Sequence, residues 1–217
     1  MFFRTPFFLP WLYPNLLWRI PTHEKEIFLT FDDGPVPGPT EFVLRELRKF
    51  NAQATFFCIG DNVSKHPWIF RQIIEQGHSI GNHTFNHLKG WSYTVQDYQE
   101  NVSRCKSELI RQGLTSQSTG VSKIDGLFRP PYGRIKRSQI KALQDYHIVM
   151  WDVLSHDYAK EIPRKRCLQG SIRSVRQGSI VVFHDSLKAE KNLTYVLPRF
   201  LDHFAQRGYS FKTIPNT

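Results

Sequence analysis

Short apolar segments alternate with longer segments of helical periodicity along this 217-residue chain, and this alternation constrains its fold most strongly. Between the apolar runs, hydrophobic residues recur three and four positions apart, as in amphipathic helices. Several of these helical segments end at a glycine, for example at Gly77 and Gly208. The alternation predicts βαβ units and a mainly parallel sheet. The predicted strands span residues 27–31, 54–59, 78–81, 126–128, 147–153, 179–183 and 209–214.

The domain organisation follows from the uniformity of the sequence. No linker, repeat or break in composition divides it, so we expect one domain over residues 27–217 after an N-terminal extension over residues 1–26. The alternation leaves two architectures open, a doubly wound open sheet and a closed or nearly closed barrel of about seven strands. Nucleotide binding has little support, because neither a Gly-x-Gly-x-x-Gly pattern nor a phosphate-binding loop follows the first strand.

The net charge of +10 favours an anionic partner such as nucleic acid, a membrane surface or an acidic polymer. A solvated basic surface is the alternative interpretation. Basic clusters occur at residues 134–141 and 164–166, but no recognition helix or set of interleaved stacking aromatics accompanies them. The sequence therefore gives little support for nucleic acid as a partner.

The N-terminal extension is rich in large apolar residues but does not match a cleavable signal peptide. Pro6, Pro10 and Pro14 interrupt its apolar stretch, Arg4 is the one basic residue there, and no Ala-x-Ala site follows. No segment reaches the ~20 apolar residues of a membrane span. We expect the extension to pack on the domain or to face a partner, and we expect a cytoplasmic protein. A degenerate export signal or anchor, with association at the cell surface, is the alternative, and the oligomeric state stays open.

Three cysteines, Cys58, Cys105 and Cys167, are too few and too irregular for a disulfide framework. Their spacing does not match a metal site made of cysteines. We expect them to be small buried apolar residues.

Polar side chains follow the carboxyl ends of the predicted strands. The carboxyl ends of parallel strands lie on one face of an α/β barrel, where active sites are built, so these side chains should converge. This convergence predicts an enzyme. The side chains are Asp32 and Asp33 after the first strand, His83 and His87 after the third, Arg129 after the fourth, Asp157 after the fifth, and His184 and Asp185 after the sixth.

Asp33, His83 and His87 form a candidate metal triad. Catalytic zinc commonly takes three protein ligands and keeps one position open. Two histidines four residues apart are weak evidence alone, and surface histidines in a loop are the alternative. A carboxylate at another strand end makes the metal site the better interpretation.

Other residues after the strands suggest proton transfer. Asp32, beside the predicted ligand, can accept a proton from the attacking water, although its segment also has the composition of a turn. Arg129 begins a rigid Arg-Pro-Pro-Tyr-Gly elbow and can hold a carboxylate, while a backbone N–H beyond the prolines can face an oxyanion. His184 is a candidate general acid, oriented by Asp157 or Asp185.

These segments together resemble the polysaccharide deacetylase family, also called the NodB-homology domain or carbohydrate esterase family 4. Residues 30–34 are similar to its first motif, 83–87 to its second and 129–133 to its third. Residues 151–158 and 179–185 resemble the fourth and fifth. The order and spacing agree, and the resemblance covers residues 25–214.

The resemblance implies a distorted (β/α) barrel and a divalent metal, usually zinc. It implies a hydrolase that removes N-acetyl groups from N-acetylglucosamine-type sugars. It implies that Asp33, His83 and His87 bind the metal. It also implies that Asp32 is the base and that Arg129 holds Asp32 in place. Tyr132 would bind the oxyanion through its backbone N–H, and His184, tuned by Asp157, would protonate the leaving amine.

The fourth motif departs from the family pattern of Asp-x-x-Asp-Trp. Leu154 replaces its first aspartate and Tyr158 its tryptophan, whereas Asp157 is kept. These departures bear on the substrate more than on the reaction. Two alternatives therefore stay open, an amide hydrolase acting on a non-sugar substrate and a catalytically silent carbohydrate-binding protein.

Overall fold

The first long strand, β1 (Glu26–Asp32), lies at the centre of a parallel sheet in the computed structural model, which describes residues 2–113 and 126–215. The strand order is β5-β4-β3-β2-β1-β7-β6, and β8 pairs with the first half of β1. Residues 27–31 are buried because helices cover one face of the sheet and the barrel interior the other. The other strands are β2 (Thr55–Cys58), β3 (Ser79–Asn82), β4 (Leu127–Phe128), β5 (His147–Ile148), β6 (Val153–Leu154), β7 (Ile180–His184) and β8 (Ser210–Lys212).

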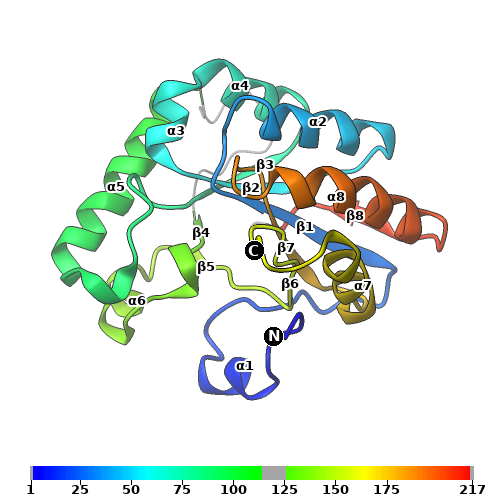
Figure 1. Cartoon of the computed structure of the whole chain (residues 1–217). Helices are drawn as coiled ribbons and strands as arrows, with labels where there is room; N and C mark the ends of the chain where they lie inside the picture. The colour runs from blue at the N-terminus through cyan, green and yellow to red at the C-terminus, as the bar shows by residue number, and fades with distance from the viewer. Residues whose placement is uncertain (1, 114–125, 216–217) are drawn as a thin grey trace.

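Helices surround this sheet, as Figure 1 shows. The main core lies between β1, β2 and β7 and the helices α2 and α8, where Phe31, Phe56, Phe183 and Phe200 are fully or almost fully buried. Two short 3₁₀ helices, η1 (Gly90–Ser92) and η2 (Pro131–Gly133), lie in the loops. The α-helices are α1 (Phe8–Leu12), α2 (Pro39–Lys49), α3 (Gly60–Lys65), α4 (Pro67–Glu75), α5 (Val95–Arg111), α6 (Arg137–Ala142), α7 (Arg164–Ser174) and α8 (Glu190–Ala205).

The sheet curls into a half-barrel of parallel strands, which confirms the predicted α/β class and distorted barrel. The single strand predicted over residues 147–153 is two short strands, β5 and β6, at opposite ends of the sheet. Between them, the N–H of Val149 bonds to Phe128 of β4, whereas the N–H of Asp152 bonds to Ile180 of β7. The chain thus crosses from one end of the sheet to the other, and the predicted loop over 114–125 lies outside the described residues.

The N-terminal segment, residues 2–20, lies along the gap between the two ends of the sheet. Leu17 forms a parallel bridge with Val149, and Arg4 forms an antiparallel bridge with Val153. The Leu154 N–H donates to the Phe3 carbonyl at 2.9 Å, and the Ile20 N–H donates to the Gly178 carbonyl at 2.9 Å. Backbone groups at the sheet ends that would otherwise need water therefore find partners in this segment.

All three cysteines are free and buried, as the sequence predicts. Among the described residues, no helix has both the length and the apolar character needed to cross a membrane.

Candidate active site

A cavity of about 600 Å³ opens at the carboxyl ends of the strands and gathers the residues that the sequence singles out. Arg129 and Asp157 lie behind its wall and are almost fully buried, at 0% and 1% exposure. The expected convergence is therefore present in the structure. The predicted site residues that line the cavity are Asp32, Asp33, His83, His87, Tyr132 and His184.

Asp33, His83 and His87 form a compact cluster of potential ligands. One ligand atom from each lies within 4.8 Å of the other two. The Asp33 Oδ1 is 3.2 Å from His87 Nε2 and 3.8 Å from His83 Nε2. Asp33 and His87 both have left-handed backbones, with φ of 82° and 55°, a strained conformation that persists where the surroundings impose it.

The surroundings of His83 fix its ring as a neutral ligand. Its Nδ1 lies 2.8 Å from the Arg129 carbonyl, which can only accept, so Nδ1 carries the proton and Nε2 faces Asp33 with its lone pair. Burial lowers the pKa of His83 to about 4 and keeps the ring uncharged at neutral pH. Burial would raise the pKa of Asp33, but the hydrogen bond from His87 and the nearby histidines hold it well below its usual range.

Arg129 holds the carboxylate of Asp32 in place. Its Nη1 donates to Asp32 Oδ1 at 2.7 Å and to the Thr30 hydroxyl at 2.7 Å, and its Nη2 donates to the Met150 carbonyl at 2.9 Å. Its guanidinium also lies 4.1 Å from the centroid of the Phe57 ring. The Arg129 guanidinium is fully buried and bonded at several atoms, so it fixes one carboxylate oxygen of Asp32. Asp32 itself borders the cavity.

His184 is oriented by Asp157. The Nδ1 of His184 lies 2.8 Å from Asp157 Oδ1, and the backbone N–H of His184 donates to Asp157 Oδ2 at 2.8 Å. Burial would lower the pKa of His184, but the charge and hydrogen bond of Asp157, with help from Asp33 and Asp32, raise it to about 9. A protonated Nε2 is therefore available toward the cavity at neutral pH.

Asp185, the other candidate partner of His184, has a different position. Its Oδ1 accepts from the Gly34 N–H at 3.1 Å and its Oδ2 from the Thr40 hydroxyl at 2.6 Å. Burial raises its pKa to about 8. Asp185 thus braces the turn that follows β1 rather than orienting His184.

The Arg-Pro-Pro-Tyr-Gly elbow forms the short helix η2. Tyr132 has a φ of 61°, its side chain is 60% exposed, and its ring centroid lies 4.6 Å from that of His87. The two backbone hydrogen bonds of this turn use the N–H groups of Gly133 and Arg134. Neither bond uses the N–H of Tyr132, and Tyr132 lines the cavity.

Sequence reasoning did not single out Asn62 and Thr40, which support the site from helices α3 and α2. Asn62 donates from Nδ2 to the Asp33 carbonyl at 2.7 Å, and Thr40 donates to Asp185. A single amide or hydroxyl on a helix gives no pattern in the sequence, so no signal was present to find them. The departing residues Leu154 and Tyr158 both line the cavity, together with Trp151.

Comparisons with known proteins give consistent results. The sequence profile described as polysaccharide deacetylase matches residues 19–151. A peptidoglycan-N-acetylglucosamine deacetylase of Bacillus cereus is 31% identical over 91% of this chain and 90% of its own length. A chitooligosaccharide deacetylase of Azorhizobium caulinodans is 33% identical over 91% of this chain and 96% of its own length. The crystal structure of the Bc1960 peptidoglycan N-acetylglucosamine deacetylase superposes with a TM-score of 0.85 and 28% identity, over 97% of this chain and 95% of that chain.

Proposed function

Because the chain belongs to the polysaccharide deacetylase family, we propose that it removes N-acetyl groups from an N-acetylglucosamine-type polysaccharide or oligosaccharide and releases acetate. One observation carries this proposal: a base, an acid and a ligand cluster border the same cavity. The base is Asp32, held by Arg129, and the acid is His184, held by Asp157. The ligand cluster consists of Asp33, His83 and His87.

The ligand cluster fits a divalent metal, most simply zinc. Two imidazole nitrogens and one carboxylate oxygen are a common catalytic zinc set, and His83 is already neutral with its free Nε2 facing Asp33. Asp33, His83 and His87 would hold the ion. When bound, it would supply Lewis-acid chemistry by drawing electron density from the acetamide carbonyl.

Asp32 is the proton acceptor in this proposal. As water attacks the carbonyl carbon, one of its protons passes to the carboxylate of Asp32, and the new C–O bond leaves negative charge on the former carbonyl oxygen. Arg129 keeps Asp32 in position and balances its charge behind the cavity wall. The backbone N–H of Tyr132 donates to the developing oxyanion.

His184 completes the reaction by protonating the leaving nitrogen. An amide nitrogen anion is a very poor leaving group, so the proton on His184 Nε2 moves to nitrogen as the C–N bond breaks. The products are acetate and the free amine of the sugar. Asp157 accepts the Nδ1–H of His184 and stabilises the charged donor before the transfer.

A second candidate function rests on the changed residues of the cavity wall. Leu154 places an apolar side chain at the cavity, where the family pattern has an aspartate, and Tyr158 is smaller than the usual tryptophan. An amide on a non-sugar compound is therefore the alternative substrate.

Acetate release from a substrate panel tests both functions. We expect release from chitin oligosaccharides or peptidoglycan fragments, stimulated by zinc after treatment with a chelator. Release from small acetylated amines alone would favour the non-sugar alternative. No release from any substrate by the zinc-loaded protein, combined with retained glycan binding, would show a silent carbohydrate-binding protein.

A further inference from the structure

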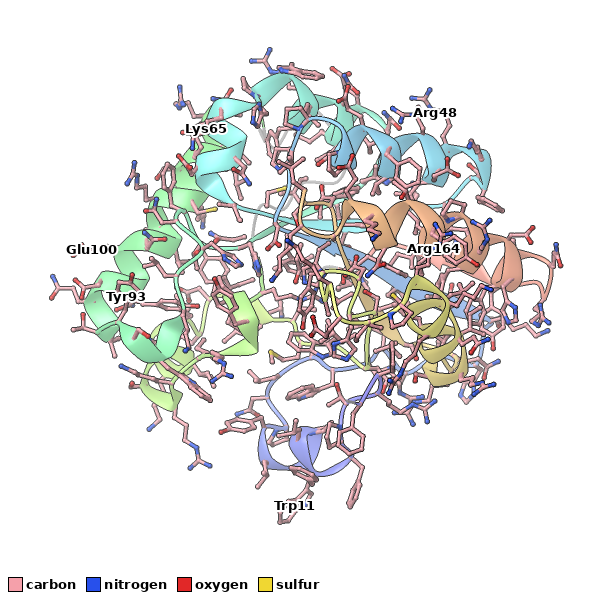
Figure 2. All side chains as sticks on the ribbon, viewed as in Figure 1. Trp11, Arg48, Lys65, Tyr93, Glu100 and Arg164 are labelled. Atoms are coloured by element: carbon pink, nitrogen blue, oxygen red, sulfur yellow. The ribbon has the colours of Figure 1, made fainter. Side chains whose placement is uncertain are left out.

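The N-terminal segment carries an exposed apolar surface that the proposed reaction does not use. Phe7 is 91% and Trp11 80% exposed, values far above those usual for large apolar side chains. Figure 2 shows Trp11 projecting away from the body of the molecule, on the side opposite to Arg48. We call this surface the aromatic patch. It consists of Phe7, Phe8, Trp11 and Leu12, which belong to α1 or directly precede it.

The aromatic patch is held on a fixed base. Leu9 and Tyr13 of the same short region pack inward on the cluster that contains Leu16 and Trp18. The Trp18 Nε1 donates to the Tyr13 carbonyl at 3.1 Å. The main-chain bonds to both ends of the sheet anchor the rest of the segment. Phe7 and Phe8 contact each other edge to face, and the outward side chains otherwise stay exposed.

Basic residues flank the aromatic patch, on stretches of the chain whose own sequence contains no acidic residue. The sequence has no aspartate or glutamate in residues 1–23, 126–144 or 162–184. The latter two ranges contain α6 and α7, and Figure 1 shows these helices on either side of α1. Contacts confirm this arrangement: Arg137 of α6 lies 5.7 Å from the Tyr13 ring, and Arg4 donates from Nε to the Ser174 carbonyl at the end of α7 at 2.9 Å.

We propose that this face docks on the surface of an anionic lipid bilayer, with the aromatic patch in the interfacial region. Aromatic side chains favour the membrane interface, and surrounding lysines and arginines are attracted by anionic head groups. The exposed Arg137, Lys141 and Arg173 lie on the flanking helices. A second copy of the chain is a poorer occupant, because a two-fold interface would bring these like charges together.

The position of the aromatic patch relative to the catalytic cavity indicates what docking would do for the reaction. A second cavity of about 360 Å³ lies between the N-terminal segment and the candidate active site. Its lining includes Leu9 and Tyr13 from the segment, and it shares Tyr132, Trp151 and Leu154 with the catalytic cavity. Docking through α1 would hold the catalytic cavity close to the bilayer and favour glycans located there.

Cosedimentation of the full chain with vesicles tests the proposal. We expect binding to phosphatidylcholine vesicles that contain phosphatidylglycerol, and weak binding to phosphatidylcholine alone. The double variant Phe7→Ser, Trp11→Ser should bind about tenfold more weakly or worse. Trp68→Ser is the matched control, because Trp68 is an exposed tryptophan on α4, at the far side of the molecule, and should leave binding unchanged.

Charge variants test the electrostatic part. Neutralising Arg137 and Lys141 to glutamine should weaken binding about fivefold for each charge, and added salt should weaken it further. The same change at Arg45 and Arg48, exposed on α2, should have little effect. Equal losses for both pairs would mean that net charge alone drives binding and would overturn the proposal.

Two further outcomes would also overturn it. One is wild-type protein that ignores anionic vesicles. The other is a dimer in sedimentation velocity that the Phe7 and Trp11 variant loses, which would assign the aromatic patch to self-association. Circular dichroism establishes that each variant is folded before it is compared, and retained acetate release shows that the catalytic site is intact.

Discussion

At the scale of single residues, the pair of His184 and Asp157 makes a prediction about pH. Asp157 raises the pKa of His184 to about 9, so the protonated acid, and with it activity, should be lost as the pH rises through that value. Asp157→Asn removes the charge, so the alkaline limb of the kcat/KM profile should move down by about one to three pH units. Asp152→Asn is the control, because this buried carboxylate bonds to Arg176 and Ser179 outside the cavity. An unmoved limb in the Asp157 variant would assign the acid to another group.

Asp32 makes a second prediction at this scale. Asp32→Asn keeps the shape and an oxygen for Arg129 Nη1 but cannot take the proton of water. Acetate release should fall by about 10²–10⁴-fold. Metal content measured by elemental analysis should not change, because Asp32 is not in the ligand cluster. Asp202→Asn, exposed on α8, should behave as wild type, and near-normal turnover by the Asp32 variant would remove it from the role of base.

At the scale of elements, the junction between the N-terminal segment and the sheet can be tested at glycines. Gly178 has a φ of 77°, and a Cβ there would collide with the Ile20 carbonyl; Gly208 has a φ of 75° and open space around it. Both alanine variants carry the left-handed strain of about 1–2 kcal/mol. Gly178→Ala should additionally displace the segment and lower the Tm by about 4–8 °C more than Gly208→Ala. Equal Tm values in a thermal melt would show that the junction contributes nothing.

The element scale also shows what the sequence predicts and what it does not. Apolar runs locate β1 and β7 well, and their ends place Asp32 and His184 correctly, because burial on both faces leaves a plain local signal. The break between β5 and β6 was missed, because it depends on partners far away in the sequence, Phe128 and Ile180. Helix α3 is not predicted, because Val63 is its one large apolar residue and a single such residue shows no periodicity.

At the scale of the whole molecule, a metal held by the folded cluster should stabilise the chain. Zinc at a hundred times its dissociation constant adds about 2.7 kcal/mol if only the folded state binds it. For a chain of this size, the Tm should then rise by about 5–11 °C. His83→Ala should lose this rise in differential scanning fluorimetry, whereas His23→Ala, at an exposed position, should keep it. A rise that survives in the His83 variant would place the metal elsewhere.

The N-terminal segment also determines the order of events during synthesis. Its partners lie far along the chain: Thr5 and Trp151, which share a hydrogen bond, are 146 residues apart, and Arg4 and Ser174 are 170 apart. At about 5–20 residues per second, the ribosome needs roughly 7–30 s to make the first of these partners after it has made Thr5. During that interval, Phe3, Leu9, Leu16 and Trp18, which are buried or half-buried in the folded chain, lack part of the structure that covers them. A segment that is made early is thus among the last to reach its native place, and it offers chaperones an aromatic target in the meantime.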